Sequence, residues 1–117
     1  MPQLIEAPER IPVPGGKQID EYVGRVRTGT EQVSVAHMRA PAGWEEPAQT
    51  PEFDEVTVVL AGTVLVDHDN GRLSVSAGQA VLTRAGERVR YLVGPEGAEY
   101  VAVCLPAFGP DLVHRED

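Results

Sequence analysis

The residues with the most scope for chemistry lie between Gly43 and Gly62, in the stretch GWEEPAQTPEFDEVTVVLAG. Its first half is an acidic loop, with carboxylates at Glu45, Glu46, Glu52 and Asp54. Such a run either attracts a cation or a basic substrate, or forms a solvated loop at the mouth of a domain. Glu55 then begins an apolar run rich in β-branched residues, which is typical of a central strand. The stretch is therefore predicted to be a strand of a small β-barrel preceded by an acidic loop.

Three histidines and one cysteine are the other side chains with ligand chemistry. His37 lies in the alternating run 32–39, where a histidine either binds a ligand or bonds to a backbone carbonyl, and the second interpretation is favoured. His68 adjoins a turn and His114 lies in the charged tail, so both are predicted to be exposed. The single Cys104 excludes an intramolecular disulfide and a thiol cluster, and its apolar surroundings predict a core residue.

Short alternating segments separated by glycine predict an all-β domain. The predicted strands are 22–26, 32–39, 55–60, 63–68, 72–76, 80–83, 88–93 and 99–105. Asn70-Gly71 favours a type I′ hairpin turn, because both residues tolerate positive φ. Residues 1–16 contain four prolines and predict an extended arm, which would lie on its own barrel or on a second subunit, with a free, disordered tail as the alternative. Residues 109–117 read as a polar tail.

The size and net charge of the chain limit the classes of partner that we expect. The 117 residues predict one domain spanning 1–117, and the net charge of -8 predicts no nucleic-acid partner and no docking on anionic lipid. No apolar stretch approaches the ~20 residues of a membrane helix. The first residues do not resemble a signal peptide either. We therefore expect a cytoplasmic protein that has no membrane partner.

The glycine spacing resembles the motifs of the cupin superfamily. The first motif is Gly, five residues, His-x-His, three or four residues, Glu, six residues, Gly. Here those places are taken by Gly43, Gln49-Thr50-Pro51, Glu55 and Gly62. The second motif, Gly, five residues, Pro-x-Gly, two residues, His, is matched by Gly78, Arg84-Ala85-Gly86 and Val89. The resemblance implies a cupin-type jelly-roll β-barrel (double-stranded β-helix) over residues 33–108. Within the superfamily, 53–108 is most similar to the cupin domain of the ethanolamine-utilisation acetate kinase type.

The resemblance also implies that the usual metal site is missing. Cupins bind a metal through three histidines and one glutamate, whereas these positions hold Gln49, Pro51, Glu55 and Val89. One carboxylate and one amide do not hold a first-row metal tightly. The prediction is a protein without a metal or another cofactor. The alternative is a metal-dependent dioxygenase or isomerase in which His37 completes a degenerate ligand set.

Aligned with the cupins, Gln49 and Glu55 point into the barrel, and the period of two adds Thr57. Tyr91 enters from another strand, and Trp44 lies at the mouth, where it would stack on a ligand or cap the core or a dimer interface. We predict a small-molecule ligand, bound by Gln49, Thr57, Trp44 and His37.

The same alignment suggests a reaction. A buried Glu55 would exchange protons near neutral pH, and Tyr91 would donate to an oxyanion. Both also have purely structural interpretations, Glu55 as a satisfied buried carboxylate and Tyr91 as a core ring. The predicted function is metal-independent small-molecule binding with a possible isomerisation, cyclisation or elimination. The alternative without catalysis is a metabolite-binding accessory protein. Small cupins pair their sheets edge to edge, so we expect a homodimer in which residues 1–16 take part.

Overall fold

The computed structural model describes residues 1–116. It consists of antiparallel strands and one short helix: β1 (Glu9–Ile11), β2 (Gln18–Val23), β3 (Ser34–Ala40), β4 (Asp54–His68), β5 (Gly71–Ser76), β6 (Ala80–Thr83), β7 (Arg90–Leu105) and α1 (Pro110–Val113). The strand order is β1-β2-β3-β7-β4-β5, and β6 pairs with β4. This arrangement confirms the predicted all-β fold. None of the described helices is long and apolar enough to cross a membrane.

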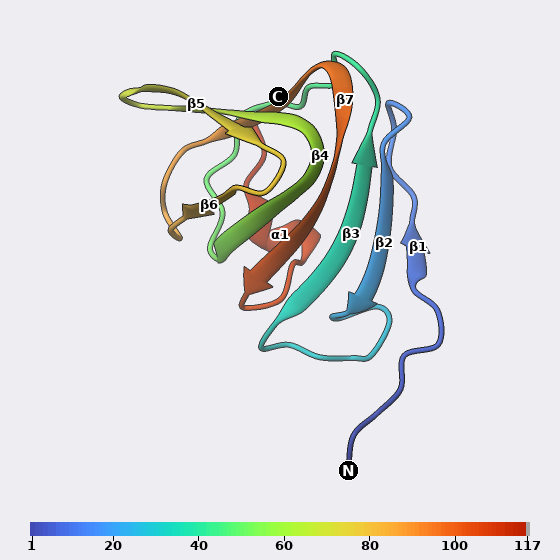
Figure 1. The fold of residues 1–117 in the computed structure, drawn as a ribbon. Coiled ribbons are helices and arrows are strands. Elements are labelled where there is room, and N and C mark those ends of the chain that lie inside the picture. The colour runs from blue at the N-terminus through green and yellow to red at the C-terminus, as the bar shows by residue number, and fades with distance from the viewer. Residues whose placement is uncertain (117) are drawn as a thin grey trace.

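Two long strands, β4 and β7, pair along their length and hold the barrel together. Figure 1 shows both strands curving from one side of the barrel to the other. The prediction divided each of them into two strands, and this is wrong. The chain does not turn at Gly62 but continues through register shifts on either side of it, between Val59 and Ala61 and between Gly62 and Val64. Such irregularities bend a strand without ending it.

The N-terminal segment lies on its own barrel over residues 9–11, where β1 pairs with β2 in the register Glu9↔Glu21. The next strand begins earlier than predicted, at Gln18 rather than at position 22. Further along the segment, a side chain at Gly15 would meet the ring of Trp44 at 3.4 Å. The segment therefore leads the chain across the mouth of the barrel. The predicted homodimer stays a prediction.

The core fills the inside of the barrel with β-branched and aromatic side chains. Val59, Val64 and Val66 from β4 are almost fully buried, and Tyr91 and Tyr100 from β7 pack with them. A smaller cluster joins Phe53, Cys104 and Val113, so the helix α1 closes one end of the barrel. Residues 109–116 thus include a packed turn of helix in place of the expected polar tail.

Candidate functional site

A cavity of about 460 Å³ opens into the barrel. Its wall is mostly apolar, and its lining comes from the N-terminal segment, β2, β3, β4, β7 and the loop before β4. The side chains with hydrogen-bonding or ionic chemistry that face it include Lys17, Trp44, Gln49, Glu55 and Tyr91. A concave apolar site with a few polar groups is the usual form of a binding pocket.

Of the six residues predicted for the site, four line this cavity: Trp44, Gln49, Glu55 and Tyr91. Thr57 is buried, with 1% of its surface exposed, but it is not part of the cavity lining. His37 is on the outer side of β3, since Ala36 and Met38 line the cavity and the side chains of a strand alternate. Its Nε2 lies 2.6 Å from Glu99 Oε2. The structure therefore does not bring His37 together with Gln49 and Glu55.

The cupin metal positions do not fit a metal ion in this chain. Val89 is a core side chain, and Pro51 has no donor atom. Among residues 1–116, no group of three or more His, Cys, Asp or Glu side chains is placed to hold one.

Gln49 is held rigidly and has an unused acceptor. Its backbone N–H donates to Val89 O at 2.8 Å, and Val89 N–H donates back at 2.9 Å. The side chain is 4% exposed, and its Oε1 has no hydrogen-bond partner among the described residues. A buried acceptor without a partner is costly, by ~1–3 kcal/mol. A ligand that offers an N–H or O–H group would remove that cost.

Glu55 stands in the cavity wall near the start of β4, between Thr83 of β6 and Cys104 of β7. Burial raises the pKa of Glu55 to about 7, although the nearby Lys17 favours the charged form. Desolvation acts this way because it penalises the carboxylate more than the neutral acid. Near neutral pH, Glu55 is therefore able both to donate and to accept a hydrogen bond.

Lys17 is the feature that the sequence analysis missed. It is the only lysine of the chain, and its Nζ lies 4.1 Å from the ring centroid of Trp44, the only tryptophan, and 5.5 Å from that of Tyr100. Burial lowers the pKa of Lys17, while Glu46 and Glu55 oppose this change. The sequence analysis placed the preceding residues in the extended arm 1–16, and no local signal indicated that the chain enters the cavity at this point.

Only part of the acidic loop at the mouth of the cavity is exposed to solvent. Glu45 is exposed, whereas the side chain of Glu46 is 13% exposed and pairs with Arg115 Nη2 at 3.4 Å. Burial raises the pKa of Glu46, and Lys17 and Arg115 counteract this. The polar part of the cavity thus contains charges of both signs.

Tyr91 has a structural partner: its hydroxyl lies 2.9 Å from the Thr83 Oγ1, and both residues are buried. The Tyr91→Phe variant removes this bond and leaves Thr83 with only a 3.5 Å bond to Glu55 O. We expect a loss of ~1–2 kcal/mol in unfolding free energy, measured by urea denaturation. The same change at the exposed Tyr22 should have little effect. An equal loss in both variants would contradict the role given to this bond.

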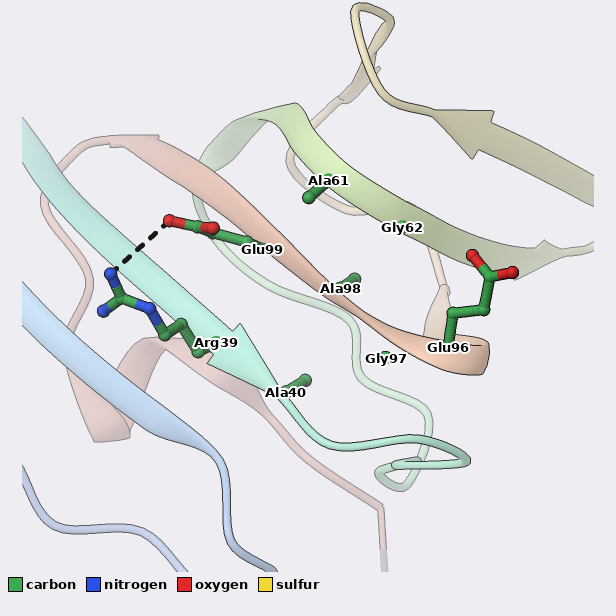
Figure 2. A pocket seen from close by; sticks show the side chains of 8 residues that line it. All are labelled: Arg39, Ala40, Ala61, Gly62, Glu96, Gly97, Ala98 and Glu99. Atoms are coloured by element: carbon green, nitrogen blue, oxygen red, sulfur yellow. Dashed lines mark ion pairs between the residues drawn. The ribbon is translucent and has the colours of Figure 1, made fainter.

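A second, smaller hollow of about 240 Å³ lies where β4 bends, and Figure 2 shows its lining. Gly62, Gly97 and alanines form its floor, and Arg39 pairs with Glu99 at 3.5 Å along one side. None of the predicted site residues reaches it. Its shape follows from the close approach of two backbones rather than from a set of convergent polar groups.

Comparison with known proteins identifies one curated relative. No family model matches the chain. The endoribonuclease YbeY of Myxococcus xanthus (strain DK1622) is 49% identical over 107 residues, which are 91% of this chain and 36% of that protein. The chain thus spans about a third of the length of this relative.

Solved structures with similar folds are more distant in sequence. A variant of oxalate decarboxylase from Bacillus subtilis superposes with a TM-score of 0.80 at 17% identity. The superposition covers 95% of this chain and 31% of the decarboxylase chain. Streptomyces PAC13, solved with uridine, has a TM-score of 0.77 at 15% identity, and the superposition covers 97% of this chain and 88% of PAC13. The EutQ protein of Clostridium difficile has a TM-score of 0.64 at 19% identity, and the superposition covers 78% of this chain and 63% of EutQ.

The endoribonuclease relative corrects our functional predictions. The predictions of a small-molecule ligand, of proton-transfer chemistry on it and of no nucleic-acid partner are wrong, as are the two small-molecule alternatives, because the relative is named for action on RNA. The charge argument failed because net charge is a sum over the chain and does not say where a strand of RNA would touch it. The prediction of the fold is confirmed: this chain has the fold of the cupin superfamily, and EutQ is among its structural neighbours.

Proposed function

We propose that this chain acts in RNA processing, as a cupin-fold domain that binds unpaired RNA for an endoribonuclease. The observation that carries the proposal is the 49% identity, across 91% of the chain, to the Myxococcus xanthus endoribonuclease. Because the match covers about a third of that protein, the proposal assigns RNA binding to this chain and makes no assignment of the cleavage step. The role also implies a cytoplasmic location, where the chain would meet the RNA that it binds.

The cavity has the volume and surface to hold one nucleoside unit of a strand. Trp44 and Tyr100 supply aromatic surface on which a base can stack. Proteins recognise single-stranded RNA mainly in this way, because an unpaired base can be splayed out of the strand. The similarity to PAC13, a protein of nearly the same length that was solved with uridine, supports a nucleoside as an occupant of a barrel of this fold.

Polar groups in the wall would then read the base or the ribose. Gln49 Oε1 would accept from a base N–H or from the ribose 2′-hydroxyl, which distinguishes RNA from DNA. Glu55 would donate or accept beside it. Tyr91 would keep its bond to Thr83 and shape the wall. Thr57 stands behind the wall, and His37 has no part in this contact.

Insertion of a nucleoside also explains how an acidic chain could bind RNA. With a net charge of -8, the chain cannot track a phosphate backbone over a long basic surface. A contact concentrated on one base and its neighbours needs few cations. We therefore expect weak dependence of binding on salt, unlike that of proteins with ~6–10 phosphate contacts.

Trp44 provides the test, because it is the only tryptophan and lies at the cavity. Addition of a single-stranded oligoribonucleotide should quench its fluorescence. In a fluorescence-anisotropy titration with labelled RNA, Trp44→Ala should weaken binding by ~5- to 150-fold, which corresponds to the ~1–3 kcal/mol measured per stacked base. Tyr22→Ala removes an exposed ring outside the cavity and should bind as the unmodified chain does.

Failure would have a clear form. The proposal is overturned if the unmodified chain does not bind single-stranded RNA at millimolar concentration. It is also overturned if duplex and single strand bind equally, or if the Trp44 and Tyr22 variants lose the same affinity.

A further inference from the structure

We propose that Lys17 binds a phosphate of the RNA strand, so that the cavity takes a phosphorylated nucleotide unit rather than a bare nucleoside. This inference rests on the proposed function and adds a binding residue to it. Lys17 immediately precedes the strand β2, where the N-terminal segment crosses the mouth of the cavity. A strand entering the cavity would have its backbone at this mouth.

Lys17 differs from the other cations of the cavity in that its side chain has no carboxylate or carbonyl partner among the described residues. Three cationic side chains line the space: Lys17, Arg25 and Arg115. Arg115 pairs with Glu46, and the Nε of Arg25 donates to Ala107 O at 3.3 Å. Within residues 1–116, no carboxylate oxygen lies within ion-pair distance of Lys17 Nζ. An ammonium group has three N–H donors, and here no carboxylate accepts a hydrogen bond from them.

The aromatic rings hold this ammonium group in place and leave its N–H donors available. Trp44 lies 4.1 Å from Nζ and Tyr100 lies 5.5 Å from it, within the range of cation–π contacts. A ring face attracts the positive charge but takes no strong hydrogen bond. The amine is therefore positioned in advance and can still donate to a phosphate oxygen. A base would contact the parts of the two rings that Lys17 leaves uncovered.

The neighbouring carboxyl groups do not cancel this site. Glu46 is balanced by Arg115 at 3.4 Å. Glu55 lies deeper, on β4, and burial favours its neutral form. A base beside Glu55 and Gln49 would place its phosphate toward the mouth, away from both.

The charge dependence of binding separates a phosphate contact from a packing role. Labelled single-stranded RNA of about ten nucleotides, without a terminal phosphate, is titrated at several salt concentrations between about 50 and 300 mM. In a single strand each phosphate contact contributes a slope of about -0.7 to log K against log salt. The variant Lys17→Met keeps the length of the side chain and should lower the affinity ~5- to 20-fold at the lowest salt, with a slope shallower by ~0.7–1. Lys17→Arg should retain the slope.

Each outcome decides a different claim. Equal slopes for the unmodified chain and Lys17→Met, with or without a loss of affinity, overturn the phosphate contact and leave the proposed function standing. No binding of RNA to the unmodified chain overturns the proposed function and this inference with it. Free uridine should bind the two equally, whereas uridine monophosphate should bind Lys17→Met more weakly. Dependence on Lys17 for the monophosphate alone would assign the contact to a terminal phosphate and overturn an internal one.

Discussion

Replacing Gly62 with alanine is expected to destabilise the protein by ~2–5 kcal/mol, because two penalties combine at this position. Gly62 has φ of +75°, a conformation that costs an L-residue ~1–2 kcal/mol. A Cβ atom there would lie 2.0 Å from Gly97 O and 3.0 Å from Ala98 Cα. Both neighbours are backbone atoms of the paired strand β7, so the clash would force β4 and β7 apart. Urea denaturation gives the change in unfolding free energy.

Gly78→Ala is the matched control for this experiment. Gly78 also has positive φ, at +86°, but a Cβ atom would meet nothing within 4 Å. We expect it to lose only the conformational penalty of ~1–2 kcal/mol. If the two variants were equally unstable, the close approach of the strands at Gly62 would not matter. If Gly62→Ala alone failed to fold, the difference would be larger than stated but of the expected sign.

Glu55 should make the protein less stable as the pH rises through the weakly acidic range. The pKa of Glu55 is about 7 in the folded chain, against an ordinary value of 4.5. Below the ordinary value, both folded and unfolded chains carry the proton, so there is no penalty. Between 4.5 and about 7 the unfolded chain ionises first, and above about 7 the penalty is constant at roughly 3 kcal/mol. The stabilising contribution of the neutral acid is therefore lost with increasing pH.

The Glu55→Gln variant should show this directly. Its unfolding free energy should exceed that of the unmodified chain by up to ~3 kcal/mol at pH 8, and the two should converge near pH 4. Denaturant titrations across that range measure the difference, and Glu96→Gln, on the exposed part of β7, is the control. If the difference in unfolding free energy between the unmodified chain and Glu55→Gln does not change with pH, ionisation of the Glu55 carboxyl is not its cause.

The fold was predictable because its glycines are required by backbone geometry. The four motif glycines have positive φ: Gly43, Gly62, Gly78 and Gly86. Residues with side chains avoid this conformation, so the spacing of these glycines records where the barrel turns or bends. The same rule failed at the predicted type I′ turn Asn70-Gly71: the turn between β4 and β5 is formed by residues 69 and 70, and of the two residues predicted to have positive φ only Gly71, the first residue of β5, does. It did not distinguish a bend from an end, which is why β4 and β7 were each divided in two.

The site was only partly predictable, since local periodicity does not set absolute direction. The period of two placed Glu55 and Thr57 on one side of β4, where Thr57 is buried and Glu55 is partly buried in the cavity wall. It could not say which side of β3 faces inward, and His37 is on the other one. Lys17 reaches Trp44 only because distant segments pack together. The proposed connection to RNA rests on a longer relative, and no local pattern in the sequence indicates it.

The position of β7 has a consequence for how the chain folds as it is synthesised. β7 follows β3 and β4 in the chain, yet it lies between them in the sheet and is their shared partner. Until it leaves the ribosome, these two earlier strands each lack a neighbour and offer an open edge to other polypeptides. Pairing over such a long sequence separation is also slow, commonly milliseconds to seconds. We therefore expect nonsense mutations upstream of β7 to yield aggregates rather than soluble fragments, because β3 and β4 would keep open edges.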